Sequence, residues 1–319
     1  IANGSSVTQI GDGNSSNVDQ LGGLNGSIVL QTGGNNMSDV NQLGIANGSL
    51  VAQLGSGNES TVDQDGGLNG SLVLQSGDRN KSDVTQDGLA NFSGVVQLGE
   101  DNFSTVSQDG EFNGSLVYQE GEFNSSDVDQ RGDNNLSGVY QEGTANDSRV
   151  KQRGEANGSA VVQLGDGNYS KVTQRGEANG SLVWQDGIDN TSRVKQKGDE
   201  NGSIVAQLGD KNKSRVDQEG DYNGSIVAQL GNRNDSRVDQ GGDNGSIVAQ
   251  IGNRNDSRVN QGGGNGSIVA QLGNRNDSRV EQGESNGSIV AQLGNRNDSR
   301  VDQGGGNGSI VAQLGNRND

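Results

Sequence analysis

The sequence predicts an all-β fold, a parallel β-solenoid with two strands in each coil. A unit of about eleven residues, Asn-x-Ser-x-Val-x-Gln-x-Gly-x-x, recurs from Asn3 to Asn307, and another copy begins at Asn318. Its four fixed residues alternate with variable ones, and a period of two is the signature of a β-strand. Short repeats in long succession are typical of solenoids, in which each repeat packs on its neighbours.

The repeats are of two alternating kinds, which together make one coil. We call them A repeats, such as Asn201–Gly209, and B repeats, such as Asn234–Gln240. One of each fills 21–22 residues, so two strands and two arcs close a flattened ring. Residues 1–319 are therefore expected to form a single array of about fourteen coils without separate domains, with parallel strands about 4.8 Å apart.

The fixed residues are the same in both kinds of repeat, so we expect them to face inward. Val gives a β-branched apolar column, Ser lets the two sheets approach, and Asn and Gln amides stack on identical neighbours in hydrogen-bonded ladders. The expected inward residues include Asn201, Ser203, Val205, Gln207, Asn212, Ser214, Val216, Gln218, Asn223, Ser225, Val227 and Gln229.

Glycine follows each repeat's Gln and is expected to form the arc between strands. Examples are Gly209, Gly220, Gly231 and Gly241. From Asn234 onward the B repeats lose one residue, so that Gly241 directly follows Gln240. A deletion that spares the glycine fits an arc better than a strand.

The outward residues differ between the two kinds of repeat. B repeats carry alternating charges such as Asp235, Arg237 and Asp239, and we expect ion pairs between coils to relieve like-charge stacking. A repeats carry an apolar face, which we expect to mediate lateral contacts between solenoids. This face includes Ile226, Ala228, Leu230, Ile247, Ala249, Ile251, Ile268, Ala270 and Leu272.

The composition excludes several classes of function. Hydrophobic residues make up 27% of the chain, and there is neither Cys nor His, so disulfides, thiolate metal sites and histidine catalysis are impossible. The formal charge of −18 argues against nucleic acid or an anionic membrane as partner. No apolar run is long enough to insert into a membrane as a helix. We expect no cofactor and no metal.

The A and B repeats resemble the curlin repeat, on the residues Ser203, Gln207, Gly209, Asn212, Ser214 and Gln218. The likeness covers essentially the whole chain, with more repeats than typical members have. It implies a secreted functional amyloid, a curli-like fibre that serves adhesion at the cell surface or in a biofilm matrix. It also implies two partners, a minor nucleator subunit and an outer-membrane secretion channel.

Other signals have a structural and a functional interpretation. Asn-x-Ser occurs in every repeat and is formally a glycosylation sequon, but a buried ladder explains it better. Gly-Asp-Gly-Asn at residues 11–14 and 165–168 suggests a calcium-binding β-roll, yet the loop that this class requires is not repeated. Asp127 and Asp129 could act as a glycosidase pair, although a monotonous sequence offers no unique site. We therefore predict that the protein is not an enzyme.

Three aromatic residues, Tyr118, Tyr140 and Trp184, are expected to face outward from A repeats. They either stack at an interface or form ordinary apolar surface.

The sequence thus favours a structural polymer that grows end to end. The chain contains no Pro, and the strands near Val7 and Val311 match the interior ones, so we expect these two strands to be the polymerisation ends. Because the chain begins inside a repeat, we expect any signal peptide to have been removed or left out. Both its first and last strands are of the A kind, so we expect either a section of a longer array or a gap of one strand at each joint. The alternative is a solenoid binding module, such as an ice-binding protein or an adhesin stalk.

Overall fold

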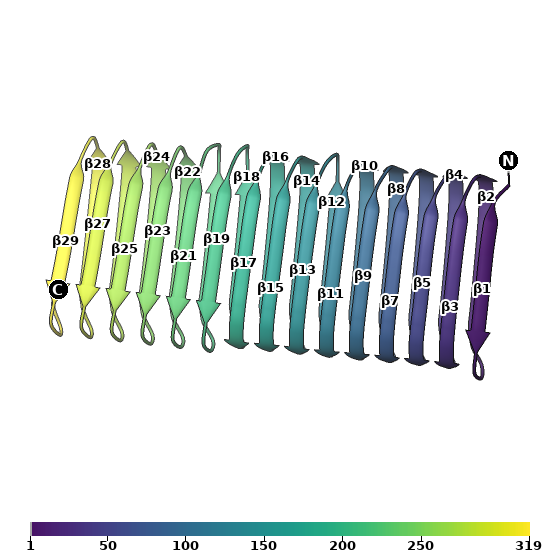
Figure 1. Cartoon of the computed structure of the whole chain (residues 1–319). Helices are drawn as coiled ribbons and strands as arrows, with labels where there is room; N and C mark the ends of the chain where they lie inside the picture. Colours follow the sequence, from purple (N-terminus) through teal and green to yellow (C-terminus); the bar gives the residue numbers. More distant parts are fainter. Residues whose placement is uncertain (1) are drawn as a thin grey trace. The chain divides into compact units, whose positions relative to one another are not determined.

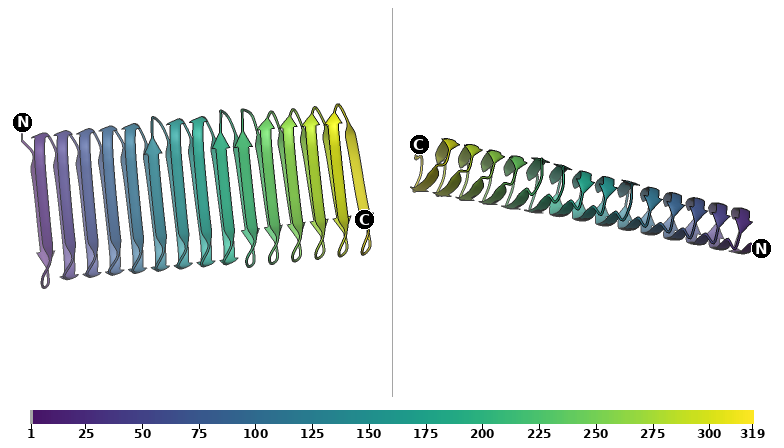
Figure 2. Two further views of the ribbon diagram at one scale, coloured as in Figure 1. Left: turned by 180° about the vertical axis from the view of Figure 1, so that it is seen from behind. Right: turned by 90° about the horizontal axis from the view of Figure 1, so that it is seen from above.

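The computed structural model describes residues 2–319, and these divide into two compact bodies, residues 2–157 and Gly158–Asp319. We call them the N-terminal and C-terminal bodies. In each, successive strands alternate between two facing parallel sheets, so that every pair of strands makes one coil (Figures 1 and 2). The A repeats form one sheet, the A sheet, and the B repeats form the other, the B sheet.

The N-terminal body contains seven coils in the residues that the structure describes. Its A sheet contains β1 (Gly4–Ile10), β3 (Gly26–Gly34), β5 (Gly48–Ser56), β7 (Gly70–Asp78), β9 (Phe92–Glu100), β11 (Gly114–Glu122) and β13 (Leu136–Thr144). Its B sheet contains β2 (Ser15–Gly23), β4 (Met37–Ile45), β6 (Glu59–Gly67), β8 (Lys81–Leu89), β10 (Phe103–Glu111), β12 (Ser125–Arg131) and β14 (Asp147–Glu155).

The C-terminal body contains seven further coils and a last A strand. Its A sheet contains β15 (Gly158–Asp166), β17 (Gly180–Ile188), β19 (Gly202–Leu208), β21 (Gly224–Leu230), β23 (Gly245–Ile251), β25 (Gly266–Leu272), β27 (Gly287–Leu293) and β29 (Gly308–Leu314). Its B sheet contains β16 (Tyr169–Glu177), β18 (Thr191–Lys197), β20 (Lys213–Glu219), β22 (Asp235–Gly242), β24 (Asp256–Gly263), β26 (Asp277–Glu284) and β28 (Asp298–Gly305). The predicted two-strand solenoid of about fourteen coils is confirmed.

Strands pair in a register that stacks identical repeat positions. In the A sheet Val205 pairs with Val227, and in the B sheet Val216 pairs with Val238. The valine side chains from Val29 to Val301 are at most 5% exposed, and they form the apolar part of the core. Burial alternates along almost every interior strand, as the period of two predicts. The core is therefore narrow, and most of its buried residues are polar.

The arcs depend on left-handed backbone at two positions. Gly209, Gly220 and Gly231 have φ angles of 105°, 93° and 114°, and the residue two places further on is also left-handed, as at Arg233 with φ 59°. Positive φ is uncommon for residues with a Cβ, so the stacking of the arcs must impose it here. Gly241 differs, because the shortened B repeat extends β22 through it and leaves Asp243, with φ 56°, as the left-handed residue.

Candidate functional site

The glutamines form a buried ladder that also joins the two sheets. Gln207 Nε2 donates a hydrogen bond to Gln229 Oε1 at 2.8 Å, one coil further along the chain. The same nitrogen donates to the Thr191 carbonyl on the facing sheet at 3.1 Å. Gln218 repeats both contacts from the B sheet. Each amide nitrogen thus uses both of its N–H groups, which removes the penalty of burying them.

The asparagines form a second ladder, which runs in the opposite direction. Asn201 donates to Asn179 Oδ1 from its backbone nitrogen at 3.2 Å and from its side-chain nitrogen at 3.0 Å, one coil back along the chain. Its Nδ2 also donates to the Gly220 carbonyl in an arc at 2.8 Å. Asn212 holds the Gly231 carbonyl in the same way at 2.6 Å, and Asn223 holds that of Gly241. The Asn ladder therefore fixes the arcs, while the Gln ladder fixes the sheets.

The serine column has a steric role. The Oγ atoms of Ser203, Ser214 and Ser225 are buried, and they make no hydrogen bond to any residue that the structure describes. The small serine side chain lets the two sheets approach closely, and its buried hydroxyl does not add a hydrogen bond to the core.

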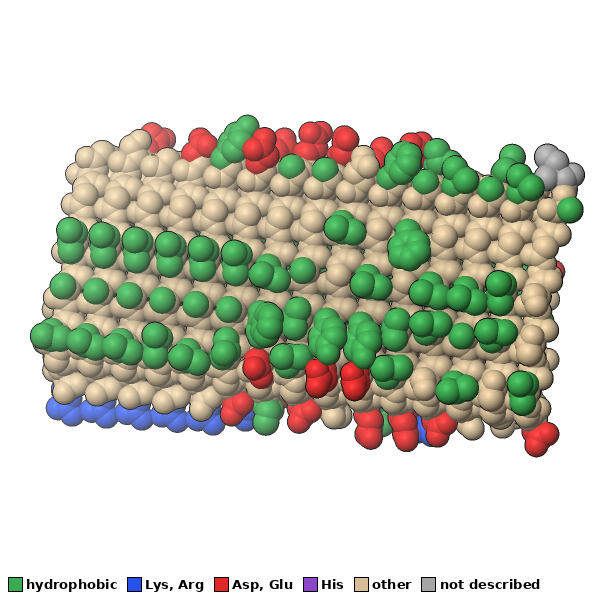
Figure 3. Space-filling model, viewed as in Figure 1, with side chains coloured by type: hydrophobic (Ala, Val, Ile, Leu, Met, Phe, Trp, Pro, Cys, Tyr) green, Lys and Arg blue, Asp and Glu red, His purple; other side chains and the backbone are tan. Residues whose placement is uncertain are grey.

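The outward A sheet of the C-terminal body is apolar. Ile226, Leu230, Ile247 and Ile251 are 42–50% exposed. Ala228, Ala249, Ile268, Ala270 and Leu272 continue these columns, which appear as green rows in Figure 3. Beside the isoleucines runs a groove of ≈ 1110 Å³, which glycines such as Gly245 and Gly266 leave free of side chains. A ridge of Ile thus lies next to a channel of Gly, with a period of one coil.

The outward B sheet carries ion pairs, arranged differently from the expectation. Lys195 contacts Asp217 at 3.0 Å across coils, as expected. However, Arg237 pairs at 2.7 Å with Asp239 of its own strand, and Arg279 pairs with Glu281 in the same way. In-register stacking places Arg over Arg, so the nearest opposite charge often lies two residues along the strand.

These columns and ladders agree with the comparison with known families. A model described as the curlin associated repeat matches residues 61–88, 77–110, 113–143, 123–152, 143–176, 171–198 and 189–220. The chain belongs to the curlin-repeat family. A search of curated proteins found no match.

The curlin repeat and the β-solenoid fold are structural rather than enzymatic, and this chain is a curli-like structural protein. Asp127 and Asp129, the possible glycosidase pair, share Lys151 at 3.9 Å, and Asp129 also contacts Arg131 at 3.2 Å. Within residues 2–319 no three acidic side chains are grouped to hold a metal ion. That same range has no helix capable of crossing a bilayer. The sequon asparagines from Asn25 to Asn297 are at most 4% exposed and lie in the core.

The three aromatic residues that we expected to face outward from A repeats lie on the outer face of the A sheet. Tyr118 and Tyr140 stack with ring centroids 5.0 Å apart, and their hydroxyls donate to Glu120 and Glu142. The hydrogen bond to Glu142, assisted by burial, raises the pKa of Tyr140 to about 12. Trp184 is 43% exposed.

The first and last curlin strands have exposed inward columns. Val7 in β1 is 45% exposed, whereas interior valines are almost fully buried, and Val311 in β29 is half-buried. Gln9 donates to Gln31, and Gln313 accepts from Gln292. The Gln ladder therefore begins at Gln9, whose Oε1 can accept a hydrogen bond, and ends at Gln313, whose Nε2 can donate one.

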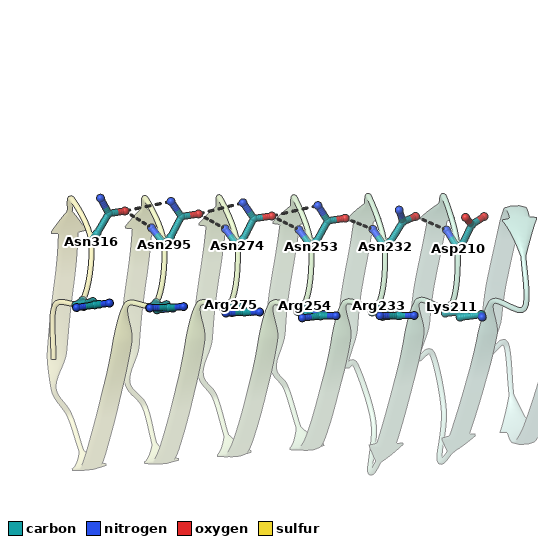
Figure 4. A pocket seen from close by; sticks show the side chains of 12 residues that line it. Asp210, Lys211, Asn232, Arg233, Asn253, Arg254, Asn274, Arg275, Asn295 and Asn316 are labelled. Atoms are coloured by element: carbon teal, nitrogen blue, oxygen red, sulfur yellow. Dashed lines mark hydrogen bonds between the residues drawn. The ribbon is translucent and has the colours of Figure 1, made fainter.

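Sequence reasoning missed one feature, the exposed column of asparagines and basic residues at the arcs of the C-terminal body (Figure 4). Its signal was the recurrence of Gly-Asn-Arg-Asn-Asp, first at Gly231–Asp235 and then in every following A-to-B arc.

Proposed function

We propose that this chain is the subunit of an extracellular curli-like amyloid fibre, which self-assembles by adding subunits end to end at the cell surface or in a biofilm matrix. The observation that carries the proposal is the direction of the two ladders. In the core ladders the Gln side chains donate towards the C-terminus and the Asn side chains donate to the Asn one coil nearer the N-terminus, so only head-to-tail joining continues both ladders. In this role the subunit would use a minor nucleator subunit and an outer-membrane secretion channel, as curli do.

Growth at the C-terminal end can be tested with proline. Gly287 N donates to Asn307 O of the next coil, so the equivalent N–H groups of β29, including those of Ile310 and Ala312, point away from β27. Replacing Ile310 and Ala312 by Pro should remove donors at the growing edge without breaking the pairing with β27. Because each head-to-tail joint uses the β29 edge of one subunit, seeds of the parent chain should add at most one variant subunit, at their C-terminal end, and should not elongate further, as followed by an amyloid dye and electron microscopy.

The matched control replaces Ile310 by Ala and Ala312 by Ser, which keeps both N–H groups and should elongate at the parent rate. Elongation of seeds by the proline variant from both ends at the parent rate would contradict end-to-end growth through β29.

Fibres of the parent chain should also give an X-ray reflection near 4.7–4.8 Å along the fibre axis, because the strands of successive coils stack at that spacing.

We also propose that the apolar A sheet of the C-terminal body joins fibres laterally through a second copy of itself. The Ile ridge and the Gly channel have the same period, so the ridge of one copy fits the channel of another, as in a dry cross-β interface. Changing Ile226, Ile247, Ile268 and Ile289 to Lys should leave single fibrils and reduce bundling severalfold in electron micrographs.

The control for this experiment changes Asp235, Asp256, Asp277 and Asp298 of the B sheet to Asn. It adds the same four units of charge to the opposite sheet, and we expect bundling to persist. Equal loss of bundles in both variants would show that charge, and not the apolar face, controls lateral association.

A further inference from the structure

A groove of ≈ 990 Å³ runs along the A-to-B arcs of the C-terminal body (Figure 4). Two parallel columns line it, one of asparagines and one of basic residues, which we call the arc asparagines and the arginine stripe. The arc asparagines are Asn232, Asn253, Asn274, Asn295 and Asn316, and the arginine stripe is Lys211, Arg233, Arg254, Arg275, Arg296 and Arg317. Asp210 lies at one end.

The arc asparagines use their acceptors on one another. The backbone nitrogen and the Nδ2 of Asn253 donate to Asn274 Oδ1 at 3.0 and 3.1 Å, and Asn274 donates twice to Asn295 in the same way. The Oδ1 atoms of Asn274 and Asn295 therefore accept two hydrogen bonds each, whereas the Nδ2 atoms of Asn253 and Asn274 carry two N–H groups and give one to the column. The column consequently presents donors to the groove.

The arginine stripe is a row of like charges, of which only Lys211 contacts a carboxylate among the residues that the structure describes, that of Asp189 at 3.9 Å. Arg233, Arg254 and Arg275 are exposed, and no member from Arg233 to Arg317 makes an ion pair with any residue that the structure describes. The arginines of the B sheet, such as Arg237, do have such partners. In-register stacking places one guanidinium per coil, about 4.8 Å apart, so their mutual repulsion favours an external anion.

We propose that this groove binds a linear acidic polysaccharide, a polymer with one carboxylate on each sugar. A guanidinium holds a carboxylate with two parallel hydrogen bonds, and the free amide N–H groups can donate to sugar hydroxyls. The length of one uronate residue is comparable to the spacing of about 4.8 Å between neighbouring coils, so successive carboxylates can meet successive members of the stripe. The proposal depends on the fold of the C-terminal body and not on fibre formation.

Nucleic acid fits the groove less well. Proteins bind single strands largely by stacking bases on aromatic rings, and none of the lining residues is aromatic. A duplex curves its phosphates away from a straight row, and its high charge density would meet a chain whose formal charge is −18. A thin polymer can lie within the groove and contact only the arginine stripe and the arc asparagines.

The test measures binding of a labelled oligogalacturonate to the 319-residue chain by fluorescence anisotropy. The same oligomer with methyl-esterified carboxyls is the ligand control, and we expect it to bind at least about tenfold more weakly because charge-assisted hydrogen bonds are lost. For about four neutralised charges, the logarithm of the affinity should fall with a slope of about −3 against the logarithm of the salt concentration.

Two variants with the same change in charge locate the site. Changing Arg254, Arg275, Arg296 and Arg317 to Gln should weaken binding by about tenfold or more. Changing Arg237, Arg258, Arg279 and Arg300 of the B sheet to Gln should alter it by less than about twofold, because those side chains face away from the groove.

A third variant, with Lys at the same four stripe positions, keeps the charge and should bind between the parent and the Gln variant. It provides the test if the Gln variant fails to show a β-sheet circular dichroism spectrum. Equal binding of the esterified oligomer, equal loss in both Gln variants, or tighter binding of single-stranded DNA than of oligogalacturonate would overturn the proposal.

Discussion

Gly252→Ala is expected to destabilise the C-terminal body by more than about 3 kcal/mol. A Cβ at this position would lie 1.9 Å from the Gly273 carbonyl oxygen of the next coil, and the backbone has a φ of 118°. Strain of about 1–3 kcal/mol from a conformation that residues with a Cβ avoid therefore adds to a clash that only movement of the arc can relieve. Such movement would break the hydrogen bond from Asn255 to the Gly273 carbonyl.

Gly245→Ala is the matched control for this substitution. Gly245 lies in the same A repeat, its φ is not left-handed, and a methyl group added to it would meet no heavy atom within 4 Å. We expect its effect to lie within about 1 kcal/mol, with either sign, since Ala also restricts the unfolded chain. The midpoint of guanidinium unfolding, followed by circular dichroism, separates the two substitutions. Similar midpoints would mean that the arcs do not stack as closely as the structure shows.

The strands and their orientation could be predicted because their signal is local and repeated. Alternation of fixed and variable residues distinguishes Val205 from its neighbour Ile204, although both are β-branched and apolar. Only the fixed residue is buried, and the variable one is 43% exposed. The position of a residue within the repeat decides whether its side chain faces the core. Equivalent positions of the A and B repeats face the same core, so they carry the same residue.

The arcs and the outer contacts could not be predicted in the same way. The left-handed residue of each arc is Leu68 in one coil, Phe112 in another and Arg254 in a third, so no residue type marks it. Its conformation comes from the stacking of neighbouring coils, which overrides local preference. The direction of the ladders could not be predicted from the sequence either. An Asn or Gln amide can donate towards either end of the chain, and the backbone conformation determines which direction it takes.

The second large effect is expected for Val248→Asp. Val248 is 0% exposed and stacks between Val227 and Val269, beside the buried amides of Gln250 and its neighbours. A carboxylate there has no cationic partner in the core, so the variant must either bury a charge or protonate it, at a cost of several kcal/mol. Because burial raises the pKa of such a carboxyl, the loss of stability should be larger at pH 7 than at pH 4.

Ile247→Asp introduces the same charge at the adjacent position, where the side chain is 42% exposed. Water can solvate that carboxylate, so we expect a loss of less than about 1 kcal/mol and little dependence on pH. The measurement is the guanidinium midpoint of both variants at pH 7 and pH 4, compared with the parent at each pH. The contrast arises because adjacent residues of one strand face opposite environments, so a pH-dependent loss of equal size in both variants would contradict the burial of the valine column.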